Sequence, residues 1–341
     1  MLNKIISEDN IQNVKKLIHK ADKIILFTHR SPDGDAVGSS LALYHFLTEY
    51  GKQVNIIVPN EIPYYLKWMP DIEEILDYEQ NPELAKEVVE AADLIFCLDF
   101  NCPKRIGQME PLLTLTDTKK ILVDHHLEPE NFCDITISHP EIASTSELVF
   151  RLICRMGLYE YVDKPCAVCI YTGMMTDTGG FTYNSNSPAI YFIISELLEK
   201  GIDKDEIYAN TYNRYTENKL RLNGFVLLKR MRLLKNRTVS LITLSTDDII
   251  HFGVQKGDTE GIVNLPMSID TVVLSAMFRE EKDMIKISLR SKGNFPSNII
   301  AKEVFGGGGH LNASGGEFYG SLNGAVKTFL DALPAYEHLL T

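Results

Sequence analysis

Short apolar segments that alternate with helical segments dominate the first 130 residues and constrain the fold most strongly. Lys23–Thr28 is apolar on both faces, which is typical of a strand in a parallel sheet covered by helices. A helix predicted at 36–50 follows and ends at Gly51. The unit recurs, with further strands predicted at 54–58, 94–98 and 121–123 and a helix at 82–92. This pattern predicts an α/β domain with a doubly wound, mostly parallel sheet that binds ligands at the carboxyl ends of its strands.

The rest of the chain indicates a second, smaller domain. Helices predicted at 143–157, 164–176 and 188–200 complete the first domain, which we assign to residues 1–195. Residues 196–235 are helical and basic, and we expect them to form a connector. Residues 236–341 are predicted to form an α+β domain, with strands at 238–244, 271–279 and 284–291 and short helices at 296–304 and 322–332.

The charge and hydropathy patterns narrow the classes of protein. A formal net charge of −12 argues against a broad surface for binding long DNA. The segment Arg214–Arg237 is a basic exception that fits either a solvated helix face or a surface that attracts phosphate. The chain has no run of about 18 apolar residues and its first ten residues lack a secretory signal pattern, so we expect a cytoplasmic location and no membrane partner.

Acidic residues and histidines lie where the predicted strands of the first domain end. Each of them alone fits a capping or turn role, but together they indicate a metal site at the carboxyl edge of the sheet. Carboxylate and imidazole ligands without thiolate suit two divalent ions, with Mn²⁺ favoured and Mg²⁺ or Zn²⁺ as alternatives, and such a pair serves phosphoryl transfer. The residues are His29, Asp33 and Asp35, then Asp99, then Asp124, His125 and His126, and Asp177 after a helical run.

These motifs resemble those of the DHH phosphoesterase family, in the family's order. The resemblance covers nearly the whole chain, since the second domain is similar to the DHHA1 domain that accompanies it. The first set comprises Thr28-His29, Pro32-Asp33-Gly34-Asp35-Ala36, Gly38-Ser39, Asp99, Asp124-His125-His126 and Thr176-Asp177-Thr178-Gly179. The second set comprises Arg290-Ser291, Gly306-Gly307-Gly308-Gly309-His310, Asn312-Ala313 and Gly315-Gly316.

The resemblance implies roles for individual residues. One ion would be held by His29, Asp33 and Asp99, and a second by Asp35, Asp99, His125 and Asp177, so that Asp99 bridges the two. The catalytic set would be Asp99, Asp124 and His126, with Asp124 orienting an imidazole and His126 touching the scissile phosphate. Substrate contacts are expected from His126, Arg290, Ser291, Gly307, Gly308, Gly309 and His310.

Within this family, the compact two-domain form resembles enzymes that degrade short oligoribonucleotides and dephosphorylate 3′-phosphoadenosine 5′-phosphate. A short RNA or nucleotide is therefore the expected substrate, and a homodimer is compatible with the pattern. The alternatives are a phosphodiesterase for cyclic or linear dinucleotides and a single-strand-specific DNA exonuclease of the same superfamily. Outside the enzymes, the alternative is an inactive nucleotide-binding module, although every motif retains its ligand residues.

Overall fold

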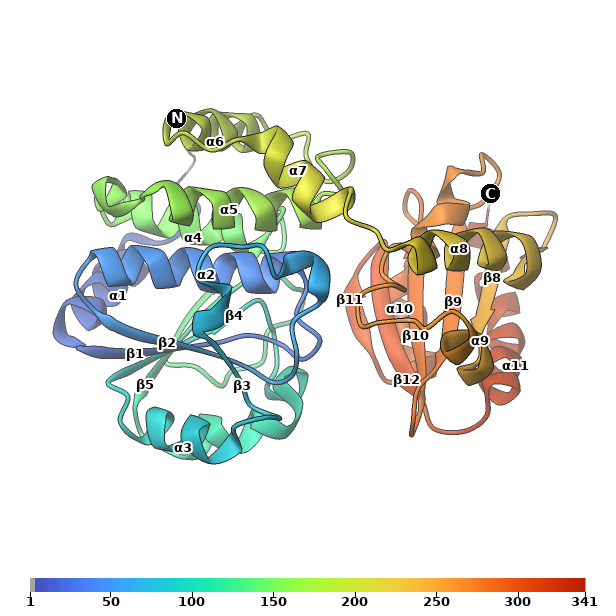
Figure 1. Ribbon diagram of the computed structural model, residues 1–341, viewed down its shortest axis with the longest axis horizontal. Helices are drawn as coiled ribbons and strands as arrows, with labels where there is room; N and C mark the ends of the chain where they lie inside the picture. Colours follow the sequence, from blue (N-terminus) through green and yellow to red (C-terminus); the bar gives the residue numbers. More distant parts are fainter. Residues whose placement is uncertain (1–3, 341) are drawn as a thin grey trace. The chain divides into compact units, whose positions relative to one another are not determined.

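The computed structural model describes residues 4–340, which divide between Arg214 and Tyr215 into two compact units (Figure 1). The segment 196–235 contributes helix α7 (Lys204–Tyr212) to the first unit and helix α8 (Glu217–Phe225) to the second. The domain boundaries at 195 and 235 stay predictions. Among the described residues, no helix is both long enough and apolar enough to span a membrane.

The first unit is built on a six-stranded sheet in which the described strands all run parallel to their neighbours. The strand order β3-β2-β1-β4-β5-β6 changes direction between β1 and β4, which is the switch point of a doubly wound fold. The predicted fold class is therefore confirmed. The strands are β1 (Lys23–Phe27), β2 (Gln53–Val58), β3 (Ile75–Asp77), β4 (Leu94–Leu98), β5 (Lys119–Asp124) and β6 (Ile135–Ser138).

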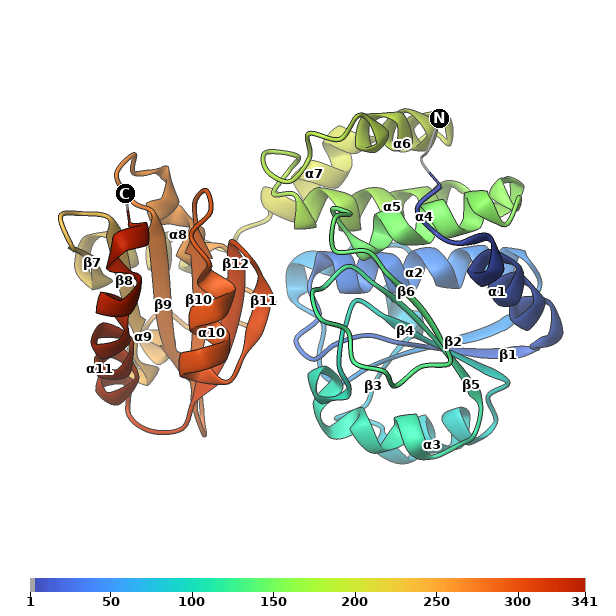
Figure 2. The ribbon, with the colours of Figure 1, turned by 180° about the vertical axis from the view of Figure 1, so that it is seen from behind.

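Helices cover both faces of this sheet, which explains why its central strands are apolar on both sides. Figures 1 and 2 show the larger helical layer on one face and α3 on the other. The larger layer contains α1 (Glu8–Lys20), α2 (Gly34–Glu49), α4 (Thr145–Arg155) and α5 (Lys164–Asp177), with α6 (Pro188–Glu199) outside it. The opposite face packs against α3 (Pro82–Glu90) and the 3₁₀ segment η3 (Pro103–Thr114).

The register of the central strands brings their carboxyl ends to one edge. Phe27 of β1 pairs with Cys97 of β4, and Cys97 pairs with Leu122 of β5. Because these strands are parallel, the chain leaves all three at the same edge of the sheet. The polar residues that follow β1, β4 and β5 are therefore delivered to one place.

The second unit contains a mixed sheet with the order β11-β12-β10-β9-β8-β7, in which β8 and β9 are parallel and the other pairs are antiparallel. Helices α10 (Ser297–Phe305) and α11 (Leu322–Ala332) pack on one face, and α8 with the 3₁₀ segment η6 (Ile262–Ser268) packs on part of the other. The predicted α+β class is confirmed. The strands are β7 (Met231–Leu234), β8 (Val239–Leu244), β9 (Leu274–Glu280), β10 (Ile285–Ser291), β11 (Gly308–His310) and β12 (Ala313–Phe318).

Some short elements were not predicted. Strands β3 and β6 lie at the two edges of the first sheet and are only partly buried, so they lack the continuous apolar pattern of a central strand. Strands β11 and β12 contain glycines, which disfavour strands. Strand β7 and helix α9 (Thr246–His251) are four and six residues long, too short for a clear periodic signal.

Glycines allow α2, α4 and α5 to meet beside the carboxyl edge of the sheet. A Cβ atom on Gly38 of α2 would lie 2.7 Å from the carbonyl oxygen of Cys169 in α5. A Cβ atom on Gly173 of α5 would lie 1.9 Å from Ser146 Oγ and 2.8 Å from Asp35 Oδ1. Side chains at these positions would push the helices apart and displace the Asp35 carboxylate.

We predict that Gly173→Ala destabilises the first unit by roughly 1–3 kcal/mol, because the added methyl group would lie 2.7 Å from the Cβ atom of Ser146, which rotation of the serine hydroxyl does not relieve. Urea unfolding followed by near-ultraviolet circular dichroism measures this. The matched control is Gly224→Ala in α8, where the new Cβ meets no atom within 4 Å and alanine favours the helix. An unchanged midpoint for Gly173→Ala would contradict the tight packing.

Candidate metal centre

The first cluster at the carboxyl edge comprises His29, Asp33 and Asp99. His29 Nε2 lies 3.4 Å from Asp99 Oδ2 and 3.9 Å from Asp33 Oδ1. His29 Nδ1 lies 2.9 Å from the carbonyl oxygen of Arg30, so Nδ1 carries the proton that it donates there. This tautomer presents the lone pair of Nε2 to the two carboxylates, as a metal ligand requires.

Asp33 and Asp99 are placed by the backbone around them. Asp33 is the N-cap of α2, and its Oδ1 accepts hydrogen bonds of 3.1 Å from the backbone N–H groups of Asp35 and Ala36. Asp99, which follows β4, has a φ of 65°, a left-handed conformation that is unfavourable for a residue with a side chain. Such strain is concentrated at functional sites, where surrounding contacts fix the conformation.

The second cluster surrounds His125. Its Nε2 lies 3.2 Å from Asp177 Oδ2, 3.5 Å from Asp99 Oδ1 and 3.7 Å from Asp35 Oδ2. Its Nδ1 lies 3.0 Å from the carbonyl oxygen of Ile142, which fixes the same tautomer as in His29. Asp99 therefore has one oxygen near each imidazole, which is the position expected of a bridging ligand.

The N-terminus of α4 anchors two of these carboxylates. Asp35 Oδ2 accepts a hydrogen bond of 2.6 Å from the backbone N–H of Thr145, and Oδ1 accepts one of 2.9 Å from that of Ser146. Thr145 Oγ1 also donates to Asp99 Oδ1 at 2.8 Å. Thr145 and Ser146 carry no sequence signal of their own, and the only local indication is the helix start at Ser144, whose hydroxyl accepts a hydrogen bond from the Glu147 N–H.

Asp124 and His126 form a third group with Asp99. His126 Nδ1 lies 2.7 Å from Asp124 Oδ1 and 3.7 Å from Asp99 Oδ1, and all three residues are buried. Asp124 therefore orients the imidazole of His126, whereas a backbone carbonyl orients that of His125. The adjacent histidines thus have different supports, in keeping with the different roles predicted for them.

Charge and burial perturb the pKa values of the cluster. Burial, followed by the charges of Asp99 and Asp177, raises the pKa of Asp35 well above its ordinary value. Burial opposes the charged form of Asp99, but contact with His29 and the charges of His125 and His29 lower its pKa to about 2. Burial likewise opposes protonation of His125, yet Asp177, Asp99 and Asp35 raise its pKa to about 9. Burial and Asp99 raise the pKa of Asp124 to about 6.

The donor set fits divalent metal ions. Three groups of three residues can each offer three ligand atoms, one from each residue. Within a group these atoms all lie within 4.8 Å of one another. Carboxylate oxygens and neutral imidazole nitrogens suit Mn²⁺, Mg²⁺ and Zn²⁺. Positive charge at these points would also relieve the repulsion between the carboxylates. The groups are His29 with Asp33 and Asp99, Asp35 with His125 and Asp177, and Asp99 with Asp124 and His126.

The residues predicted to bind substrate in the second unit lie around β10 and β11. Arg290 is half-exposed on β10 and donates to the carbonyl oxygen of Leu289. Ser291 is buried, and its hydroxyl donates to the carbonyl oxygen of Phe295 at 2.7 Å, so it supports the turn after β10. Gly307 precedes β11, whereas Gly308, Gly309 and His310 form it, so this run is an ordered edge strand.

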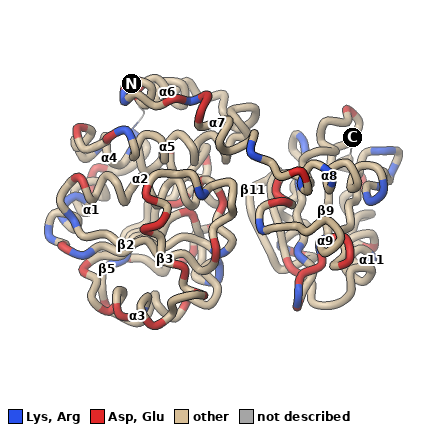
Figure 3. The backbone as a smooth tube through the Cα atoms, in the orientation of Figure 1, with Lys and Arg blue, Asp and Glu red and all other residues tan. Residues whose placement is uncertain are grey.

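Four of the eight basic residues of the segment 214–237 make local contacts within the second unit. Arg221 pairs with Glu217, Arg230 with Asp248, and Lys235 with Glu337. Lys219 is buried, and its Nζ donates to the carbonyl oxygen of Gly257. Figure 3 shows basic and acidic residues interspersed over both units. These contacts favour the solvated-face interpretation of the segment.

Comparisons with known proteins agree with these features. Residues 23–174 match the model of the DHH family, N-terminal domain, and residues 238–336 match that of the DHHA1 domain. The chain is 29% identical over 320 residues to the bifunctional oligoribonuclease and PAP phosphatase NrnA of Thermus thermophilus, covering 93% of this chain and 88% of that protein. It is 26% identical over 299 residues to the protein of the same name from Bacillus subtilis, covering 87% and 90%.

A solved structure is similar over the full length. The crystal structure of an exopolyphosphatase-related protein from Bacteroides fragilis matches this chain with a TM-score of 0.94 and 57% sequence identity. The match covers 99% of both chains, so it includes both units.

We predict that metal affinity rises with pH. His125 must lose a proton before Nε2 can bind an ion, and its pKa of about 9 means that the metal-free protein holds this proton at neutral pH. The apparent affinity for Mn²⁺ should therefore rise roughly tenfold per pH unit between pH 6 and 8, with the raised pKa of Asp35 steepening the dependence at the acidic end.

Calorimetric titration of metal-free protein in buffers of different ionisation enthalpy measures both the affinity and the protons released. The matched control is His338→Gln, which removes an exposed histidine of the second unit and should keep the same pH dependence. Binding without proton release at pH 7 would contradict the prediction.

Proposed function

Because the chain belongs to the DHH family of phosphoester hydrolases and carries a DHHA1 domain, we propose that it hydrolyses short oligoribonucleotides and 3′-phosphoadenosine 5′-phosphate. The observation that carries the proposal is the arrangement around Asp99, whose two carboxylate oxygens face the Nε2 atoms of His29 and His125. Such an arrangement suits a pair of ions that share one carboxylate.

The proposed metal ligands form two sets that share Asp99. His29, Asp33 and Asp99 would hold one ion, and Asp35, Asp99, His125 and Asp177 the other, with Mn²⁺ favoured and Mg²⁺ or Zn²⁺ as alternatives. When bound, the ions would supply a more acidic water and positive charge opposite the phosphate. Asp35 and Asp99 are already fixed by α4, so the ligands need little rearrangement to bind.

His126 contacts the substrate in this proposal, and Asp124 orients His126. The Asp124 carboxylate accepts a hydrogen bond from His126 Nδ1 and so directs the opposite edge of the ring toward the scissile phosphate. A proton held at Nε2 would then donate to a phosphate oxygen, where negative charge builds up during the reaction.

Substrate contacts are also proposed for the second unit. Arg290 has the planar guanidinium that binds a phosphate through two hydrogen bonds, and His310 supplies an imidazole beside Gly308 and Gly309. Gly307, whose backbone N–H donates to the carbonyl oxygen of Ala301, stays a predicted contact. Ser291 supports the loop after Arg290 and stays a predicted contact. A cytoplasmic location and a homodimer also stay predictions.

Purified protein with Mn²⁺ is expected to release phosphate from 3′-phosphoadenosine 5′-phosphate and mononucleotides from ribonucleotides of two to five residues. A side-by-side panel should also contain a cyclic dinucleotide, a single-stranded oligodeoxynucleotide, pyrophosphate and tripolyphosphate. The substrate assignment is wrong if one of these is hydrolysed while neither of the first two is. Absence of any turnover would favour the inactive nucleotide-binding module.

Asp99→Ala should reduce turnover by roughly 10³-fold or more and weaken the binding of both proposed ions, because each loses a ligand. Metal content by mass spectrometry and hydrolysis rates under saturating Mn²⁺ measure the two effects. The matched control is Asp331→Asn, which removes an exposed carboxylate from α11 and should change neither. If Asp99→Ala keeps two ions and near-normal turnover, the shared-ligand arrangement is refuted.

A further inference from the structure

Helix α6 packs on the first unit through one face only. Ile190, Ile193 and Leu197 are buried in the core of that unit. Figures 1 and 2 show the helix outside α4 and α5, in the outermost layer of the unit. The opposite face of α6 therefore belongs to the surface of the molecule.

This outer face contains two aromatic residues, one leucine, one serine and one glutamate. They are the exposed residues of the range 189–199, namely Tyr191, Phe192, Ser195, Leu198 and Glu199. Tyr191 is 53% exposed, and Phe192 and Leu198 are each 41% exposed. Single apolar side chains are common on protein surfaces, whereas several on one helix face are typical of a surface that binds a partner.

The five exposed positions are symmetric about Ser195. Tyr191 and Glu199 lie four residues on either side of it, and Phe192 and Leu198 lie three residues on either side. Residues three and four apart lie on the same face of a helix. When two copies of α6 pack antiparallel around a two-fold axis at Ser195, Tyr191 meets the partner's Glu199 and Phe192 meets the partner's Leu198. The outer face of α6 thus matches a second copy of itself.

The residues that meet in this arrangement are chemically complementary. Phe192 and the partner's Leu198 remove apolar surface from water. The Tyr191 hydroxyl can donate to the carboxylate of the partner's Glu199. That carboxylate also comes close to the first turn of the other α6, where the unpaired backbone N–H groups favour negative charge. Ser195 is small, so the two helices can approach closely at the axis.

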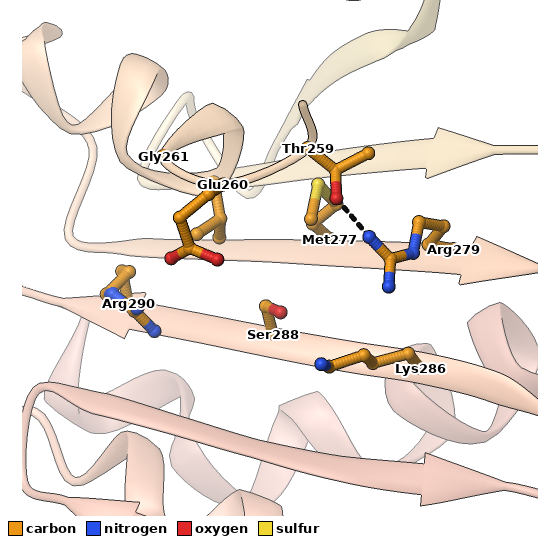
Figure 4. Close-up of a pocket in the computed structure, with 9 residues that line it drawn as sticks. Thr259, Glu260, Gly261, Met277, Arg279, Lys286, Ser288 and Arg290 are labelled. Carbon is orange, nitrogen blue, oxygen red and sulfur yellow. Dashed lines mark hydrogen bonds between the residues drawn. The ribbon is translucent and has the colours of Figure 1, made fainter. Parts of the chain in front are cut away.

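Charge also favours a second copy as the occupant. Two copies of a chain with a net charge of −12 repel each other, so they associate best through a surface with few charges. Glu199 is the single charged residue among the five exposed positions, and a face without cations offers nothing to the phosphates of a nucleic acid. The pocket of the second unit contrasts with this face, because Glu260, Arg279 and Lys286 line it (Figure 4).

We propose that the protein forms a two-fold symmetric dimer through the outer face of α6, with the two helices antiparallel and Ser195 on the axis. A pair of 12-residue helices buries less than the about 800 Å² per partner of a standard interface, so the dimer is reversible. The proposal concerns the first unit and is independent of the proposed substrate.

Sedimentation velocity of the full chain across micromolar concentrations tests the dimer. Wild-type protein should change from monomer to dimer as its concentration rises. Phe192→Asp and Leu198→Lys should each weaken the dimer by about tenfold or more, because each places a charge against an apolar side chain. The matched control is Leu228→Asp, which makes a similar change at a leucine of the second unit that is 76% exposed, and it should leave the dimer unchanged.

Mixing the two weakened variants tests the antiparallel register. In the mixed pair, the new carboxylate at position 192 faces the new ammonium group at position 198, and the remaining Phe192 faces the remaining Leu198. An equimolar mixture of Phe192→Asp and Leu198→Lys should therefore dimerise again. A partner other than a second copy gives no such recovery.

A disulfide cross-link tests the position of the axis. Ser195→Cys places two thiols opposite each other, so oxidised glutathione should convert this variant to a covalent dimer on a non-reducing gel. The matched control is Ser268→Cys, at an exposed serine of the second unit, which should stay monomeric on the gel.

The proposal is overturned if wild-type protein stays monomeric, if Phe192→Asp weakens the dimer no more than Leu228→Asp does, or if the mixture of weakened variants stays monomeric. Circular dichroism checks that each variant is folded. Failure of the proposed function would appear separately, as absence of hydrolysis by wild-type protein with Mn²⁺.

Discussion

The first unit depends on holding several carboxylates close together against their mutual repulsion. Asp35, Asp99 and Asp177 each have an oxygen within 3.7 Å of His125 Nε2, in a largely buried region where charges interact strongly. The raised pKa of Asp35 and the raised pKa of His125 are two results of this arrangement. Divalent cations would reduce the repulsion between these carboxylates more than protons do. Folding and metal binding are therefore expected to be coupled.

The fold offsets this repulsion with backbone groups as well as with charges. The N-terminus of α4 donates two N–H groups to Asp35, and Asp33 caps the N-terminus of α2. Gly173 lets α5 approach closely enough for this contact, since a Cβ atom there would overlap Ser146 and touch Asp35. The positions of the carboxylates are therefore fixed together by Gly173, by the N-terminus of α4 and by the strained backbone of Asp99.

The second unit presents a different chemistry. Its sheet is covered by helices on one face, whereas the other face is only partly covered and carries the half-exposed residues of β10. The alternation along β10 puts Lys286, Ser288 and Arg290 on this face, and the glycines of β11 and β12 keep the adjoining surface flat.

The sequence by itself determined the two fold classes and the polar residues at the strand ends, because buried parallel strands and the motifs after them leave a local pattern. Local patterns are weak for edge strands such as β3 and for glycine strands such as β11, which long-range pairing stabilises. Only the tertiary structure decided that Thr145 and Ser146 anchor the carboxylates, that different groups orient His125 and His126, and that Lys286 lies beside Arg279. Such contacts join residues distant in the chain, so no single segment of the sequence encodes them.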